Sequence, residues 1–536
     1  MTTRRDFLKN LMAGACATFT LNTLCTGSVA GQRQKPNVLM IVSDDLNDYL
    51  GVMDGHPQAK TPNIDHLVRQ GVLFANAHSN APICAPSRAS FMSGILPTTS
   101  KNYGFQAWQK NQVLRSVKML PEYLRENGYK AYCTGKIEHH PKYSIWDGIG
   151  LKQYHGPVAY NGKEPVPHPS VPSAFGSIGL LDGTFASLAD IPAVPALKNA
   201  PGYTGWWHAR RNKPFRYVND EDRDKMWDEE SADWFREKIK SLENDKDHGP
   251  FFIAFGIMSP HTPHVAPKKH FDMYPLETLK IPVIKEGDRD DCKLDEVLPN
   301  TKGQTHFAAL KESYSSLDEG LRAYLQAYLA CVSFVDDIVG DVMSTLDNSK
   351  FKDNTIVILF SDHGYNMGEK DYLFKNCLWE ESTRVPFVIR DPRYTKNAGK
   401  IVDHPIGLID VYPTIKDLCG LRGATVKNRQ GAELDGHSLK PFLEDPDSGV
   451  WGGPDVALSV VKENCSVRSK NYRYIRYSNG SEELYDHTED SYEWYNVADD
   501  PKYAEIKEEL KIQLIEMVPN IPKALVNEPP DDNGRK

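Results

Sequence analysis

Two pairs of potential metal ligands lie far apart in the sequence. Asp44 and Asp45 follow one apolar run, and Asp362 and His363 follow another. Carboxylate oxygens are the ligands that a hard divalent cation such as Ca²⁺ or Mg²⁺ prefers. One Asp-Asp pair alone is weak evidence, because Asp commonly caps helices and opens turns. Two such pairs, each after an apolar strand-like run, predict a divalent-cation site.

The segment CAPSR at residues 84–88 contains a candidate nucleophile. Pro86 suits the first turn of a helix, so we expect Cys84 at a helix N-terminus, where backbone N–H groups favour an anion. By residue type alone, a cysteine is more often a small core residue or half of a disulfide. The seven cysteines after residue 30 include no CxxC pair, which argues against a zinc or redox motif. Their odd number leaves at least one unpaired or modified, and Cys84 is our candidate.

Four apolar runs predict strands of one parallel sheet. They are residues 38–42, 131–133, 251–255 and 355–360. Ligands of open α/β sheets bind at the carboxyl ends of the strands. We therefore expect the polar residues after each run to share one site. Besides the two pairs above, these residues are Lys136, His139 and His261.

Helical spacing appears in two further segments. Residues 61–71 combine a proline near the start, an apolar stripe and a final glycine, and residues 321–346 carry a long apolar stripe. Residues 141–225 are rich in Pro, Gly and aromatics and have no sustained period, so we expect irregular loops there that shape specificity.

The pattern changes after about residue 440. Short strand-like runs surround a turn at residues 479–480, and a helix is predicted near 501–518. We predict an α/β fold in which residues 31–440 form a large, mostly parallel central sheet flanked by helices. Residues 441–536 are predicted to form a small α+β subdomain with an antiparallel sheet.

The first thirty residues predict an export signal. The run TRRDFLK at residues 3–9 precedes an apolar stretch, 11–24, and the small-residue site SVA at 28–30. This order is typical of a twin-arginine signal peptide, which implies a bacterial source and a periplasmic or extracellular location. A membrane anchor is disfavoured, because the stretch is shorter than ~20 apolar residues and contains Thr and Asn. We expect no stable membrane span after cleavage.

The net charge restricts the class of partner. The chain carries a formal charge of −9, and removal of residues 1–30, with three positive charges and one negative, makes it −11. Such an excess of negative charge argues against nucleic acid as a partner. An anionic substrate would need basic residues gathered in one pocket.

The motifs together resemble a known family. The Cys-x-Pro-x-Arg core of residues 84–88 is similar to the sequence read by formylglycine-generating enzymes, and residues 35–500 resemble the sulfatases of the alkaline phosphatase superfamily. Within that family, the motifs most resemble the iduronate-2-sulfatase branch. The matching stretches occur in family order: SDDL at 43–46, TPNID at 61–65, CAPSR at 84–88, GKIEH at 135–139, HTPH at 261–264, SDHG at 361–364, and GE at 368–369 leading to Lys375.

The resemblance implies an alkaline-phosphatase-like sandwich and a covalent mechanism. A maturation enzyme would oxidise Cys84 to formylglycine, whose hydrated aldehyde supplies the hydroxyl that attacks sulfur. Arg88 would hold this nucleophile. Lys136 and Lys375 would bind the sulfate oxygens as fixed cations.

The resemblance also implies two proton-transfer residues and a Ca²⁺ site. His261 would protonate the leaving sugar oxygen, and His139 would take the proton from the second hydroxyl; both would contact substrate, and an ordinary histidine pKa near 6.5 suits these tasks. His363 is a nitrogen donor where many sulfatases have Asn, so its direct ligation is left open. The implied ligand set is Asp44, Asp45, Cys84, Asp362 and His363.

The implied reaction is hydrolysis of a sulfate ester on a sulfated polysaccharide or glycosaminoglycan fragment. A 2-O-sulfated uronate is a reasonable first substrate, although sulfate-site motifs do not read the sugar. We expect residues 95–110, 141–225 and 283–310 to do so. One alternative is phosphodiester, phosphonate or arylsulfate hydrolysis on the same scaffold. Another is a non-catalytic protein that binds sulfated glycans and keeps Cys84 as a thiol.

Overall fold

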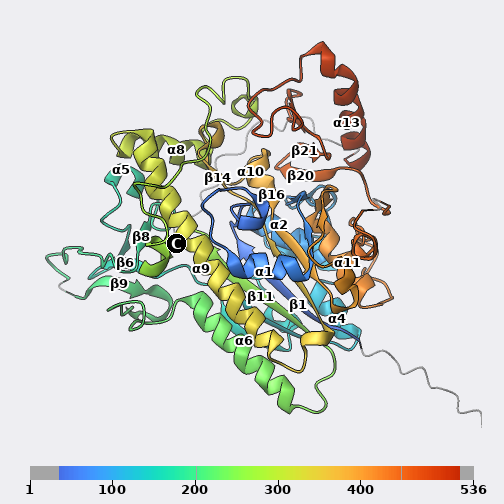
Figure 1. The fold of residues 1–536 in the computed structure, drawn as a ribbon, viewed down its shortest axis with the longest axis horizontal. Helices are drawn as coiled ribbons and strands as arrows, with labels where there is room; N and C mark the ends of the chain where they lie inside the picture. Colours follow the sequence, from blue (N-terminus) through green and yellow to red (C-terminus); the bar gives the residue numbers. More distant parts are fainter. Residues whose placement is uncertain (1–34, 201, 448–449, 519–536) are drawn as a thin grey trace, which may run out of the picture. The chain divides into compact units, whose positions relative to one another are not determined.

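An eight-stranded mixed sheet forms the centre of the computed structural model, which describes residues 35–200, 202–447 and 450–518 (Figure 1). The strand order is β18-β2-β17-β13-β1-β11-β4-β5. The five strands from β13 to β5 are parallel, and they include all four predicted strands. Their bounds are β1 Asn37–Asp44, β4 Lys130–Gly135, β5 Gly148–Lys152, β11 Phe251–Pro260 and β13 Thr355–Ser361.

The remaining three strands make the sheet mixed. Strand β17 (Phe387–Arg390) runs antiparallel to β13, β2 (Val72–Phe74) runs antiparallel to β17, and β18 (Ile401–Val402) is parallel to β2. The predicted fold class is therefore confirmed as a large, mostly parallel α/β sheet.

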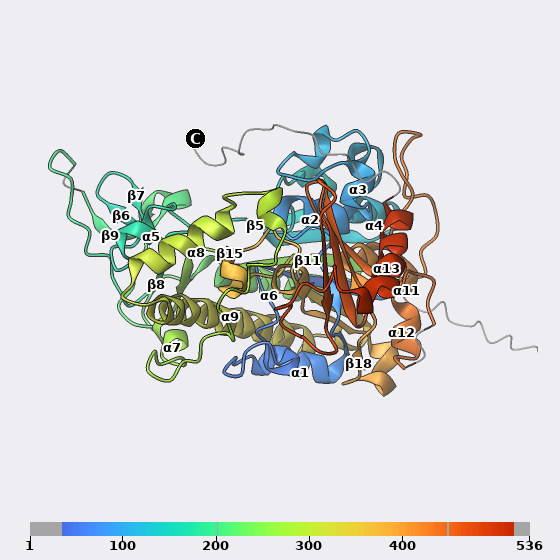
Figure 2. The same ribbon diagram turned by 90° about the horizontal axis from the view of Figure 1, so that it is seen from above.

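Helices cover both faces of the sheet (Figure 2). Alternate residues of β1 point to opposite faces: Leu39 and Ile41 pack in the apolar core on the side of α1, α6 and α9, while Val38, Met40 and Val42 pack on the side of α2, α4 and α11. Because both faces are covered, the strands read as continuous apolar runs. The helices are α1 Pro62–Gln70, α2 Cys84–Ser93, α4 Leu120–Glu126, α6 Trp227–Asn244, α9 Leu317–Asp347 and α11 Val411–Leu418.

Both helices expected from their spacing are present. Helix α1 lies within the predicted range 61–71, and α9 extends the predicted stripe at both ends. The α9 N-terminus is capped by Ser316, whose hydroxyl accepts a hydrogen bond from the backbone N–H of Glu319 at 3.2 Å. Its apolar stripe is buried against the sheet, in agreement with its interpretation as core packing.

The region 141–225 is more ordered than its composition indicated. It contains a small antiparallel sheet in the order β10-β9-β6-β7. Trp206 of β9 is fully buried, whereas its neighbour Trp207 lies on the opposite face and stacks on Tyr160 of β6 with ring centroids 4.2 Å apart. Strands this short contain too few alternating apolar and polar residues to be recognised from the sequence. Their bounds are β6 Val158–Asn161, β7 Pro165–Val166, β9 Thr204–His208 and β10 Lys213–Pro214.

A four-stranded antiparallel sheet in the order β20-β21-β22-β23 follows, as predicted for the C-terminal part. A buried ion network attaches it to the main body: Arg473 of β22 contacts Glu493 at 2.5 Å and also pairs with Glu380 of α10. The bounds are β20 Ala457–Val461, β21 Asn464–Arg468, β22 Tyr472–Arg476, β23 Glu482–Asp486, α10 Glu380–Thr383 and the final helix α13 Ala504–Met517.

Some predictions concern other parts of the chain. The twin-arginine signal at residues 1–30 lies outside the described residues, and the domain boundary near residue 440 stays a prediction. Among the helices of the described ranges, none combines the length and apolar character needed to cross a bilayer.

Candidate active site

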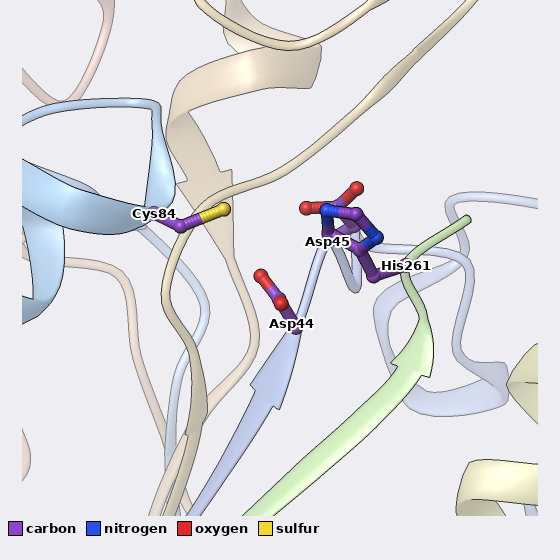
Figure 3. A group of neighbouring side chains, drawn as sticks. All are labelled: Asp44, Asp45, Cys84 and His261. Carbon is purple, nitrogen blue, oxygen red and sulfur yellow. The ribbon is translucent and has the colours of Figure 1, made fainter. Parts of the chain in front are cut away.

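The carboxyl ends of the parallel strands meet at one edge of the sheet, and Figure 3 shows four of the predicted site residues there: Asp44, Asp45, Cys84 and His261. Asp44 is the last residue of β1, and Asp362 directly follows β13. Lys136 directly follows β4, and His261 directly follows β11. The polar residues at the carboxyl ends of the parallel strands therefore lie at one edge of the sheet, where open α/β sheets bind their ligands.

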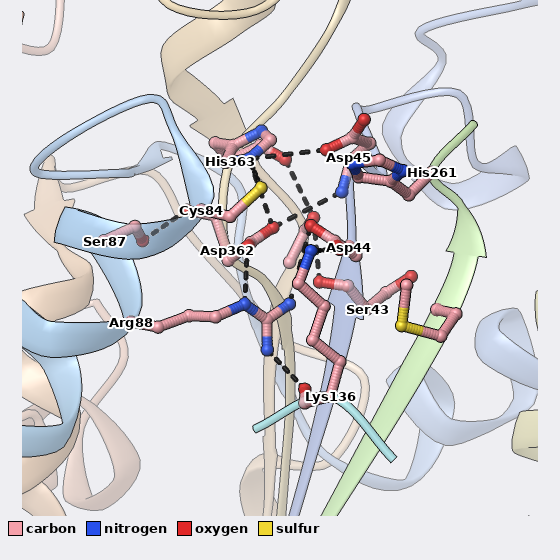
Figure 4. A network of polar contacts seen from close by, with 12 residues as sticks. Ser43, Asp44, Asp45, Cys84, Ser87, Arg88, Lys136, His261, Asp362 and His363 are labelled. Carbon is pink, nitrogen blue, oxygen red and sulfur yellow. Dashed lines mark hydrogen bonds and ion pairs between the residues drawn. The ribbon is translucent and has the colours of Figure 1, made fainter. Parts of the chain in front are cut away.

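Possible metal ligands form two overlapping groups. The ligand atoms of Asp44, Cys84, Asp362 and His363 all lie within 4.8 Å of one another, and a second group replaces the last two with Asp45 and His261. The Nε2 atom of His363 is 3.4 Å from Asp45 Oδ1 and 3.6 Å from Asp362 Oδ1. Its Nδ1 lies 3.0 Å from the carbonyl oxygen of Gly364, which leaves Nε2 directed at the carboxylates (Figure 4).

The electrostatics of these carboxylates fit a divalent cation. Burial and the neighbouring Asp44 and Asp362 raise the pKa of Asp45 to about 8, although Lys375 opposes this shift. Burial raises the pKa of Asp362 to about 6. Asp44 is fully buried, and its Oδ1 accepts no hydrogen bond from any described residue. Crowded carboxylates with an unsatisfied oxygen are the donor set that Ca²⁺ or Mg²⁺ would stabilise.

Cys84 is the first residue of α2, as the position of Pro86 predicted. No side chain caps this helix, so its first N–H groups remain available to an anion. The side chain is only 3% exposed, and Sγ lies 3.3 Å from His363 Nε2 and 3.6 Å from Lys375 Nζ. Burial and Asp44 raise the pKa of the Cys84 thiol to about 12.

Arg88 contacts the acidic residues beside Cys84. Its Nε donates a 2.8 Å hydrogen bond to Asp362 Oδ2, and Nη2 lies 3.6 Å from Asp44 Oδ1. Its Nη1 also donates a hydrogen bond to the carbonyl oxygen of Lys136. Burial disfavours the charge of Arg88, but Asp362 and Asp44 outweigh that effect and raise its pKa. Arg88 thus fixes the positions of two carboxylates below the candidate nucleophile.

Two buried lysines flank the site. Lys375 Nζ pairs with both carboxylate oxygens of Asp45, at 2.5 and 2.7 Å, and Lys136 pairs with Asp44. Both residues are at most 3% exposed. Burial alone would lower the pKa of each, but Asp45 raises that of Lys375 and Asp44 raises that of Lys136. Two permanent positive charges therefore lie next to Cys84 and its carboxylates.

The two candidate proton-transfer histidines line different small cavities. His261 is beside Asp44 and Asp45, and its Nδ1 is 2.7 Å from the carbonyl oxygen of Thr262. His139 lines a small cavity with Ala85 and Arg88, and its Nδ1 is buried without a partner among the described residues. Burial lowers the pKa of His139 to about 3, and burial with Lys375 lowers that of His261, so neither imidazole has the ordinary pKa near 6.5 that was expected from the sequence.

Two further residues near His261 could not be predicted from the sequence. The His155 ring lies 4.8 Å from that of His261, and Asp182 accepts a 2.7 Å hydrogen bond from the hydroxyl of Thr262. Both come from the region 141–225, which was expected to shape specificity but had no motif. Only the tertiary structure identifies which of its residues reach the site.

Comparisons with known proteins identify the related families. The family described as Sulfatase matches residues 36–421, and the family described as N-sulphoglucosamine sulphohydrolase, C-terminal, matches residues 368–520. A sulfatase of Formosa agariphila is 33% identical over 494 residues, which cover 90% of this chain and 86% of the relative. The iduronate 2-sulfatase of Mus musculus is 28% identical, with coverage of 78% and 76% respectively.

A solved structure shows the same fold. The phosphonate monoester hydrolase of Agrobacterium radiobacter superimposes with a TM-score of 0.65 at 22% identity, covering 91% of this chain and 96% of that one. The fold is thus alkaline-phosphatase-like. On the family match and the sequence identity to a curated relative, the chain belongs to the sulfatase family and is a sulfuric ester hydrolase.

Proposed function

We propose that this enzyme removes a sulfate ester from a sulfated saccharide, with a nucleophile made from Cys84 and with bound Ca²⁺. One observation carries the proposal: the thiol of Cys84 lies at a helix N-terminus within 3.6 Å of the Lys375 ammonium and beside a buried carboxylate cluster. This arrangement offers a nucleophile position, fixed positive charge and cation ligands in one place. A 2-O-sulfated uronate is the first substrate to test, because iduronate 2-sulfatase is among the relatives.

The donor set suits Ca²⁺, which would be held by Asp44, Asp45, Asp362, His363 and the modified residue 84. When bound, the ion supplies positive charge that polarises the nucleophile and offsets the charge of the sulfate. Lys136 and Lys375 would then no longer be needed as the counter-charges of Asp44 and Asp45. We infer that they stabilise the charge on the sulfate oxygens during transfer.

Cys84 is proposed to be oxidised to formylglycine by a separate maturation enzyme. The hydrated aldehyde supplies one hydroxyl that attacks sulfur and a second whose deprotonation allows sulfate to leave by C–O cleavage. His261 would donate a proton to the sugar oxygen as the S–O bond breaks. His139, next to Ala85 in its cavity, would accept the proton of the second hydroxyl.

We also propose that the protein is exported. The support is the twin-arginine pattern at residues 3–9 with its following apolar stretch and small-residue site. A sulfated polysaccharide or glycosaminoglycan fragment would be met outside the cytoplasm, which fits this route.

The test is sulfate release from a panel of sulfated di- and oligosaccharides by enzyme produced with a formylglycine-generating enzyme. Phosphodiesters and phosphonate esters are compared in parallel, and Cys84→Ala serves as the control. We expect turnover of at least one saccharide sulfate that Cys84→Ala abolishes. Preferential turnover of phosphorus esters, or release that survives Cys84→Ala, would contradict the proposal.

A further inference from the structure

The carboxylate of Asp182, which lies outside the predicted site, is connected to His261 through Thr262. The Asp182 side chain is 21% exposed, and its Oδ1 accepts a 2.7 Å hydrogen bond from the hydroxyl of Thr262. Thr262 is 2% exposed and directly follows His261. The His261 Nδ1 atom is 2.7 Å from the Thr262 carbonyl oxygen and 3.4 Å from its hydroxyl oxygen. Asp182, Thr262 and His261 thus form one connected chain of polar contacts.

Strand pairing explains how two distant segments meet in this way. Strand β8 (Phe185–Ser187) pairs in parallel with β12 (His264–Ala266), and Phe185 is the partner of His264. The backbone N–H of His264 also donates a 3.0 Å hydrogen bond to the carbonyl of Thr184. Asp182 lies in the turn just before β8, and Thr262 lies just before β12. The register of this short parallel pair therefore sets Asp182 against Thr262.

The hydrogen-bonding capacity of the groups fixes the direction of the contacts. Burial opposes ionisation of Asp182, but His306 and Thr262 outweigh it and lower the pKa of the carboxyl below its usual value. An ionised carboxylate only accepts, so the Thr262 hydroxyl must donate to it. The carbonyl of Thr262 can only accept, so Nδ1 of His261 carries a proton. Nε2 is the nitrogen left for proton exchange, and His261 must carry a second proton there, as an imidazolium, before it can donate one to the sugar oxygen.

Packing restricts the imidazole from a second direction. The His155 ring lies 4.8 Å from the His261 ring at an angle of 60°. His155, Gly156, His261 and Thr262 line one small cavity. The ring of His261 is thus held by polar contacts at Nδ1 and by an aromatic neighbour.

We propose that Asp182 is a positioning residue for His261: it fixes Thr262, which in turn holds the imidazole where it can protonate a sugar leaving group. This inference rests on the proposed role of His261 as proton donor. In this proposal Asp182 acts through its hydrogen bond to Thr262 and not on the reacting atoms. Proton donation by a positioned side chain commonly contributes about 10²–10⁴ in rate, so imperfect orientation should be visible in kinetics.

A purely structural role for Asp182 makes a different prediction. Its Oδ2 also lies 3.9 Å from the ammonium of Lys302, which is 57% exposed. That contact could merely stabilise the turn before β8. Lys302→Ala removes this pair without changing the hydrogen bond to Thr262, and it is therefore the matched control.

The experiment compares kcat/KM for a saccharide sulfate, whose alcohol leaves only with a proton, and for an aryl sulfate, whose phenolate leaves without one. We expect Asp182→Ala and Thr262→Val to reduce saccharide turnover by about 10–100-fold and aryl turnover by less than about threefold. Lys302→Ala should keep the wild-type ratio of the two. Equal losses on both esters, or a Lys302→Ala variant that reproduces the effect, would overturn the inference.

His261→Ala separates failure of the inference from failure of the proposed function. If His261→Ala impairs only the saccharide sulfate but Asp182→Ala does not, the positioning role is wrong and the proton-donor role stands. If His261→Ala impairs both esters equally, the proton-donor role itself is wrong. A crystal structure of Asp182→Ala gives a readout independent of turnover: we expect a displaced or doubly occupied His261 ring, and an unchanged ring would contradict us.

Discussion

Substitution of Lys375 by alanine tests whether this lysine stabilises the charge on the sulfate oxygens during transfer. The ammonium of Lys375 lies 3.6 Å from Cys84 Sγ, and the side chain is 4% exposed. Two unit charges ~4 Å apart attract by about 4 kcal/mol at an effective dielectric constant of ~20. Loss of a fixed charge from a transition state therefore corresponds to a decrease of about 10²–10³-fold in kcat.

Lys302 offers a matched control for this charge. Its ammonium lies 5.7 Å from the centroid of the Phe374 ring, and that of Lys375 lies 5.3 Å from the same centroid. Lys302 is 57% exposed, so its removal should cost at most about 1 kcal/mol, or fivefold in rate.

The assay is steady-state sulfate release by wild type, Lys375→Ala and Lys302→Ala. Thermal unfolding and bound Ca²⁺ are measured on the same samples, since Lys375 also pairs with Asp45. If folded, Ca²⁺-loaded Lys375→Ala keeps kcat within threefold of wild type, or if Lys302→Ala is impaired as strongly, the assignment of Lys375 is wrong.

Three further predictions concern the cation and the ion network. Chelation of the cation should lower both the apparent Tm and the activity, and excess Ca²⁺ should restore them. The reason is that a ligand at 100 times its Kd stabilises the folded state by about 2.7 kcal/mol. An unchanged Tm after chelation would argue against a bound cation. Arg473→Ala leaves Glu380 and Glu493 buried without this partner, so the free energy of unfolding should fall by about 3–5 kcal/mol in denaturant titrations, and a loss below 1 kcal/mol would refute this. Burial opposes ionisation of Glu493, but Arg473 and His487 lower its pKa to about 2. The stabilisation of the fold by ionised Glu493 is therefore complete above the unfolded pKa near 4.5 and is lost as pH falls towards 2. The difference in Tm between wild type and Glu493→Gln should narrow over that range. A constant difference would contradict the lowered pKa of Glu493.

The sequence predicted the strands and their polar ends because both signals are local. A strand buried on both faces is a continuous apolar run, and the residues after β1 and β13 stand out as charged side chains next to it. The position of Pro86 likewise predicted that a helix begins at Cys84. Parallel topology then brings these ends together, so that one general rule locates most of the site.

Other parts of the site depend on long-range pairing that no local pattern records. Asp182 meets Thr262 only because β8 pairs with β12, and each of these strands has three residues. His155 approaches His261 from the region 141–225, where strands β6, β7, β9 and β10 have only two to five residues each. The contacts of Arg88 with Asp362 and Asp44 also required coordinates.

The chemical state of residue 84 tests the central claim most directly. The enzyme should be produced with a formylglycine-generating enzyme, digested, and the peptide containing residue 84 analysed by mass spectrometry alongside Cys84→Ala. We predict a peptide that has lost one sulfur and two hydrogens, has gained one oxygen, and reacts with a hydrazide probe. An unmodified cysteine thiol in a preparation that hydrolyses saccharide sulfates at full rate would contradict the account.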